Sequence, residues 1–102
     1  MDIGTISSRY AKALFSLAKD KGQESRVYDD MKMLTVSFEQ EPGLKAVLDN
    51  PIFPEEEKVK LLKTAAGLEV CELFIRFIRL VLQRKRESLL PLMAYIYIHM
   101  YR

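Results

Sequence analysis

The 102-residue sequence contains little of what catalytic and metal-binding sites are usually made from. It has one histidine, His99, and one cysteine, Cys71, and they lie far apart, so no closely spaced set of metal ligands can be drawn. Its four glycines are isolated from one another, which excludes a glycine-rich phosphate-binding loop. The sequence therefore predicts no catalytic residues, no cofactor and no metal site, and a protein that is not an enzyme.

An excess of charge of one sign is also lacking, because the formal net charge is only +2. Nucleic-acid-binding domains usually carry a marked basic excess on one face, so the sequence speaks against a nucleic-acid partner. One cysteine cannot form an internal disulfide. We expect Cys71 to be a small buried side chain on an apolar helix, and His99 to lie on the surface of the last helix.

No apolar run is long enough to cross a membrane. The longest nearly apolar stretch, residues 89–98, contains Pro91 and is far shorter than the ~20 residues that a spanning helix needs. The first residues lack the basic and then apolar order of a secretory signal. We expect any association with a membrane to be indirect.

The apolar residues that are present recur at helical spacing, and they predict an all-α, six-helix bundle in a single domain. Residues such as Gly22, Gly67 and Asn50-Pro51 end the expected helices. Residues 95–98 alternate in a way that also fits a strand, but no other segment offers a strand partner. The expected helices cover about residues 5–21, 24–40, 44–49, 54–66, 70–84 and 88–102.

Two charged clusters have ordinary structural explanations. Residues 55–57 are three glutamates in the first turn of the fourth helix, where carboxylates favour the positive end of the helix dipole. We expect Glu56 to pair with Lys60 one turn later. Residues 84–86, Arg-Lys-Arg, are expected to form a solvated turn at the end of the fifth helix.

The first helix carries more apolar surface than one core needs. Its apolar residues cover an arc of about 200° at ~100° per residue, whereas a stripe of little more than about 100° docks a surface helix. We expect one side to pack on the core and the other to bind a partner. The apolar set is Ile6, Tyr10, Ala11, Ala13, Leu14, Phe15, Leu17 and Ala18.

The fifth helix has the same excess, with an apolar arc of about 220°. It is either the central helix of the bundle or the second side of a partner groove, and two such helices in one small domain favour the groove. Its apolar residues are Val70, Cys71, Leu73, Phe74, Ile75, Phe77, Ile78, Leu80, Val81 and Leu82.

Several motifs, in order, carry a family resemblance. They are RYAKALF at residues 9–15, Asn50-Pro51, FIRLV at residues 77–81, and LLP at residues 89–91, which follows Arg86. With these motifs in this order, the chain resembles the delta subunit of bacterial ATP synthase. In mitochondria that subunit is called the oligomycin-sensitivity-conferring protein. It departs from the family pattern at Arg76, where Asn is frequent, and at Arg84-Lys85, where Asn-Gly is common. The second departure predicts a longer or differently turned junction before the last helix.

The resemblance implies the amino-terminal domain of a peripheral-stalk (stator) subunit. Such a subunit sits on top of the F1 head and holds it against rotation during proton-driven ATP synthesis. The resemblance implies a peripheral location at the cytoplasmic face of a bacterial inner membrane. It also implies a C-terminal domain, absent from this sequence, that would meet the b subunits. From the helix stops and the apolar periodicity we expect the chain to be a monomer when isolated.

The resemblance further implies that helices one and five form a groove for the amino-terminal helix of an α subunit. It places Ala11, Leu14, Phe15, Ala18, Phe74, Ile78 and Val81 in the core. It places in the groove Ile6, Tyr10, Ala13, Leu17, Leu73, Phe77 and Leu80.

Two other hypotheses remain open from the residues alone. One is a self-associating bundle whose excess apolar arcs meet in a homodimer. The other is a helical RNA-binding or transcription-factor module that uses the basic residues Arg76, Arg79, Arg84, Lys85 and Arg86.

Overall fold

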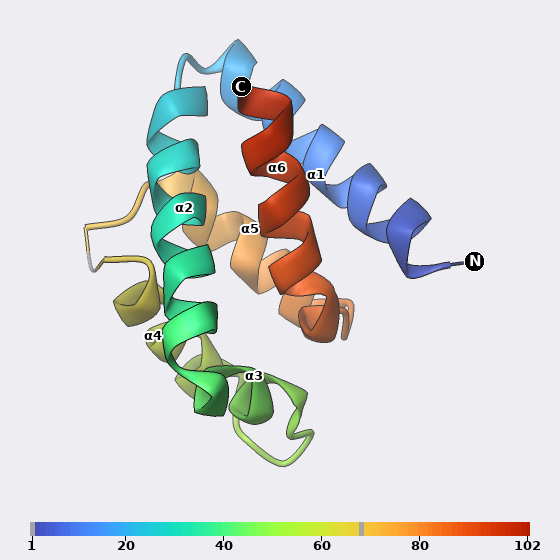
Figure 1. Ribbon diagram of the computed structural model, residues 1–102, viewed down its shortest axis with the longest axis vertical. Coiled ribbons are helices and arrows are strands. Elements are labelled where there is room, and N and C mark those ends of the chain that lie inside the picture. The colour runs from blue at the N-terminus through green and yellow to red at the C-terminus, as the bar shows by residue number, and fades with distance from the viewer. Residues whose placement is uncertain (1, 68) are drawn as a thin grey trace.

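The computed structural model describes residues 2–67 and 69–102, and these residues contain helices and no strand (Figure 1). The predicted all-α bundle of six helices in one globule is confirmed. The elements are α1 (Ile3–Asp20), α2 (Glu24–Gln40), α3 (Pro42–Asp49), α4 (Glu55–Ala65), α5 (Glu72–Gln83), the short 3-10 helix η1 (Glu87–Leu89) and α6 (Leu90–Tyr101).

The helix ends follow local backbone chemistry. Gly22 and Gly67 adopt positive φ angles of 65° and 111° just after α1 and α4. These are the left-handed helix-end conformations that the sequence predicts for these two glycines. Pro54, expected inside the first turn of α4, instead has extended backbone angles and precedes the helix. Residues 95–98 are helical, as predicted, but the expected last helix is preceded by η1.

Helix α6 lies between α1 and α2, while α5 lies behind it in the view of Figure 1 and packs on α2 and α4. The α6 side chain that organises this arrangement is Tyr97, which is fully buried. Its hydroxyl donates a hydrogen bond of 2.8 Å to the carbonyl oxygen of Glu24, the first residue of α2. Its ring contacts Phe15 of α1 edge-on, with centroids 5.5 Å apart. Tyr97 thus connects α6 to both α1 and α2.

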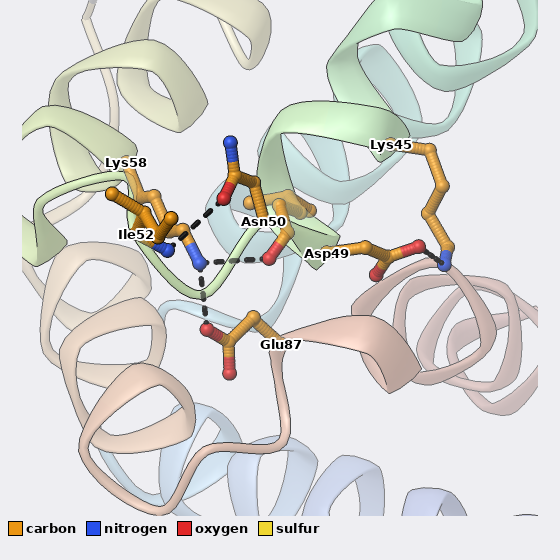
Figure 2. A network of polar contacts seen from close by, with 7 residues as sticks. Lys45, Asp49, Asn50, Ile52, Lys58 and Glu87 are labelled. Carbon is orange, nitrogen blue, oxygen red and sulfur yellow. Dashed lines mark hydrogen bonds and ion pairs between the residues drawn. The ribbon is translucent and has the colours of Figure 1, made fainter.

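A buried lysine connects the lower helices of the bundle (Figure 2). The Nζ atom of Lys58 in α4 donates to the carbonyl oxygen of Leu48 in α3, at 2.8 Å, and to Oε2 of Glu87 in η1, at 2.9 Å. Just after α3, the Asn50 side chain accepts a hydrogen bond from the backbone N–H of Ile52 at 3.0 Å. The Asn50-Pro51 turn is thus held beside the start of α4.

Two sequence-based expectations about packing are wrong. Glu56 forms its ion pair with Arg79 of α5, while Lys60 approaches Glu57, with 3.9 Å between Nζ and Oε1. The i,i+4 pairing rule considers one helix at a time, so it could not predict the contact between Glu56 and Arg79 on another helix. Phe15, assigned to the core, is only partly buried because its ring lies against the rim of the core beside Tyr97.

The expected burial of the lone cysteine and the expected surface position of the lone histidine are confirmed, but Cys71 lies just before α5 in extended conformation and not on the helix. Cys71 is buried, and its Sγ atom donates a hydrogen bond to Oε1 of Gln23 at 3.2 Å. His99 is exposed on α6, where its ring contacts that of Tyr95. Neither side chain takes part in a cluster of potential metal ligands within the described residues.

Candidate partner-binding groove

A groove of about 490 Å³ lies between α1 and α5. Among the described residues, α1 packs chiefly on α6 and α5 chiefly on α4, so the two helices do not pack closely against each other there. All seven residues that sequence analysis placed in a groove line this one: Ile6, Tyr10, Ala13, Leu17, Leu73, Phe77 and Leu80.

The α1 wall of the groove follows from two adjacent stripes on one helix. The buried stripe, at successive spacings of four, three and four residues, consists of Ser7, Ala11, Leu14 and Ala18. Each groove residue of α1 precedes one of these by one position, which rotates it about 100° away. Ile6 and Tyr10 are half-buried, Ala13 is exposed, and Leu17 is 42% exposed. These side chains leave an apolar edge of α1 uncovered.

The α5 wall has a floor and a rim. Leu73 and Phe77 are only 4% and 6% exposed, so they form the floor and also contribute to the core. Leu80 is 41% exposed and stands at the rim. The residues assigned to the core on this helix, Phe74, Ile78 and Val81, are fully buried or nearly so.

A buried hydrogen bond fixes the start of α5. The Oδ2 atom of Asp30 in α2 accepts from the backbone N–H of Cys71, the residue before α5, at 2.9 Å. Burial raises the pKa of the Asp30 carboxyl above its ordinary value, even though this hydrogen bond and the nearby Arg26 act in the opposite direction. The bond anchors the helix that carries one groove wall.

Four arginines also line the groove, and sequence analysis did not place them there: Arg9, Arg76, Arg84 and Arg86. Residues 84–86 form the expected turn at the end of α5, but Arg84 and Arg86 also line the groove, whereas Lys85 lines a separate hollow. A signal for Arg76 and Arg84 was available, since each lies four residues from Leu80 and therefore on the same edge of α5.

Arg86 reaches the groove because the chain reverses after α5. Lys85 has a φ of 56°, the left-handed conformation, and the backbone N–H of Arg86 donates to the carbonyl oxygen of Val81 at 3.0 Å. The N–H of Lys85 donates to Leu82 at 3.0 Å, which completes the Schellman pattern of a helix end. The residue after Lys85 is thereby returned beside the last turn of α5.

The groove offers a surface for binding. It combines an apolar floor and rim with positive charge, and no carboxylate is among its lining residues. The described residues include no group of three or more His, Cys, Asp or Glu side chains placed to hold a metal ion. In the same residues, no helix has the length and apolar content needed to cross a membrane.

Comparison with known proteins decides the family. The family described as ATP synthase delta (OSCP) subunit matches residues 6–102. The chain belongs to this family. ATP synthase subunit delta of Parabacteroides distasonis is 74% identical over 102 residues, which is all of this chain and 57% of that protein.

More distant relatives carry the same name. The ATP synthase delta subunits of Phocaeicola vulgatus and Bacteroides fragilis are each 47% identical, over 103 and 104 residues, and this chain covers 56% of each. The chain therefore spans little more than half the length of these curated relatives. The family assignment applies to the helical bundle that contains the groove.

Proposed function

We propose that this chain is the amino-terminal helical domain of a delta subunit and that its groove binds the amino-terminal helix of an ATP synthase α subunit. On this proposal the domain sits at the top of the F1 head as part of the peripheral stalk. It is a non-catalytic part that holds the head against rotation during proton-driven ATP synthesis.

The observation that carries the proposal is the apolar groove between α1 and α5. An amphipathic helix binds by laying its apolar face into such a groove, with anchor residues about one turn apart. The exposed rim, Leu17 and Leu80, and the buried floor, Leu73 and Phe77, provide complementary apolar surface from two helices. Tyr10 adds a large side chain with a hydroxyl, a type enriched at binding hot spots.

The proposal extends to the other parts of the complex, with family membership as its support. A further C-terminal domain of the full delta subunit would contact the b subunits, and the contact with a membrane would be indirect, through the complex. The corresponding location is peripheral, at the cytoplasmic face of a bacterial inner membrane. The isolated chain is expected to be a monomer, and sedimentation equilibrium that gives a dimer at micromolar concentration would favour self-association through the groove instead.

The test is calorimetric titration of the 102-residue chain with a synthetic amino-terminal peptide of the α subunit from the same organism. Tyr10→Ala should weaken binding by roughly 30-fold, because truncation of a central aromatic anchor costs ~2 kcal/mol or more. Leu80→Asp should weaken it at least as much, because the carboxylate would be desolvated in the groove.

The matched control is Ile52→Asp, since Ile52 is 87% exposed and lies in the turn before α4, away from the groove. This variant should bind like the wild type. Thermal melts of all three variants should show a folded domain, because Leu80 is at a rim and Tyr10 is half-buried. Wild-type binding by both Tyr10→Ala and Leu80→Asp would refute the groove assignment.

A further inference from the structure

The charged residues that line the groove are all arginines. Arg9 comes from α1, Arg76 from α5, and Arg84 and Arg86 from the turn that ends α5. The whole chain has a formal net charge of only +2, so this grouping is a local feature of one surface.

These arginines take little part in ion pairs that hold the helices together. Arg79, three residues after Arg76, forms an ion pair with Glu56 of α4. Arg76, by contrast, has only a contact of 3.8 Å to Glu72 on its own helix, and both side chains are exposed. Within residues 2–67 and 69–102, no carboxylate lies within 4.0 Å of the guanidinium groups of Arg9, Arg84 or Arg86. Their charge is available to a bound partner.

The spacing of Arg76 and Arg84 indicates how negative charges would be spaced on a bound helix. Arg76 and Arg84 lie four residues on either side of Leu80, the exposed apolar residue of the rim. Eight residues correspond to roughly 12 Å along a helix, or about two turns. A helix lying beside α5 would therefore present side chains seven or eight residues apart to these two guanidinium groups.

We propose that the groove selects an amphipathic helix whose apolar stripe is flanked by carboxylates about two turns apart, which pair with Arg76 and Arg84. This inference rests on the proposed function and adds the charge pattern of the occupant. Arg9 and Arg86 extend the same positive rim. Charges at the rim of an interface steer association and select among partners, while the apolar floor provides affinity.

A helical peptide fits this surface better than a nucleic acid does. Most of the groove lining is apolar, and it includes Leu17, Leu73, Phe77 and Leu80 as well as the arginines. Single-stranded nucleic acids bind on exposed aromatic faces along a charged path. Here Phe77 is buried in the floor and Tyr10 is half-buried, so no such stacking platform is open.

The test uses two synthetic peptides: the amino-terminal segment of the α subunit from the same organism, and a copy in which every Asp and Glu is replaced by Asn and Gln. At 50 mM NaCl the wild-type chain should bind the neutral copy about tenfold more weakly than the natural peptide. The Arg76→Gln/Arg84→Gln variant should bind the natural peptide about fivefold more weakly than the wild type and should discriminate less between the two peptides. At 500 mM NaCl these differences should shrink, because salt screens exposed charges.

The matched control is Lys21→Gln/Lys60→Gln, which removes the same charge from exposed positions outside the groove. It should bind both peptides like the wild type. Equal binding of the two peptides by the wild-type chain, or an equal loss in the control variant, would overturn this inference while leaving the proposed function intact.

Two other outcomes separate the proposals. If the natural peptide does not bind the wild-type chain at all, the proposed function fails and the charge pattern fails with it. If a single-stranded oligouridine displaces the bound peptide at comparable concentration, the arginines form part of a nucleic-acid site and the inference is overturned.

Discussion

At the scale of single residues, a few polar groups fasten the ends of helices to one another. Asp30 holds the start of α5, Tyr97 holds the start of α2, and Lys58 joins α3 to η1. Each is buried, and each has a hydrogen-bond partner. Such groups are costly to leave unpaired, so they fix which helix ends lie together.

The variant Asp30→Asn distinguishes the effect of the Asp30 hydrogen bond on stability from the effect of its charge. The folded pKa of Asp30 is raised, so the folded state binds this proton more tightly than the unfolded state, and the wild-type stability falls as pH rises through that raised pKa. Asn keeps an oxygen for the N–H of Cys71 without the charge. Urea unfolding should therefore show Asp30→Asn at least as stable as the wild type at pH 7, with any advantage lost near pH 3.

Asp30→Ala is the control for the hydrogen bond. It leaves the N–H of Cys71 without its acceptor and should lose about 1–3 kcal/mol at pH 7. A comparable loss in Asp30→Asn would mean that the charge itself stabilises the fold, for instance through the nearby Arg26.

Phe15→Ala tests the edge of the core. A fully buried phenylalanine would cost about 3–5 kcal/mol on truncation. Because Phe15 is only partly buried and contacts Tyr97 edge-on, we expect a loss of about 2 kcal/mol in urea unfolding. An unchanged unfolding midpoint would show that the ring contributes nothing to the core.

The sequence predicted the burial of single residues better than it predicted their interaction partners. The burial of Phe74 was predictable, because an apolar residue on a strongly apolar helix face has few alternatives. The partner of Glu56 was not, because a charge within reach on its own helix gives no information about Arg79 of another. Pairing across helices depends on tertiary geometry, which a pattern within one segment does not contain.

At the scale of the elements, the helices were predictable and one junction was not. The bounds of α2 were predicted as residues 24–40 and are confirmed, because Pro42-Gly43 follows it and its apolar spacing is regular. The junction after α5 contains η1 and a left-handed Lys85. The sequence departs from the family there, yet the observed turn is the one in which glycine is favoured.

Lys85→Gly should therefore stabilise the domain. A side chain in the left-handed region costs roughly 1–2 kcal/mol, part of which the flexibility of glycine in the unfolded chain offsets. We expect a net gain of about 0.5–1 kcal/mol in the free energy of unfolding. A loss of stability in this variant would indicate that the Lys85 side chain makes a favourable contact that outweighs the backbone strain.

At the scale of the whole molecule, the groove lies between α1 and α5, which pack mainly on different neighbours. The two apolar arcs indicated its walls, and the seven predicted lining residues lie together. Arg84 and Arg86 were missed because a basic run at a helix end is usually a solvated turn. Only the reversal of the chain at Lys85 brings Arg86 beside the groove, and that depends on a backbone conformation.

The most direct test of the central claim is amide chemical-shift mapping of the isotope-labelled chain during titration with the α-subunit amino-terminal peptide. The account predicts that the largest shifts fall on residues 6–17 of α1 and 73–86 of α5 and its final turn, with little change in α3 and α4. Shifts concentrated on α3 and α4, or no shifts at peptide concentrations in the millimolar range, would contradict it.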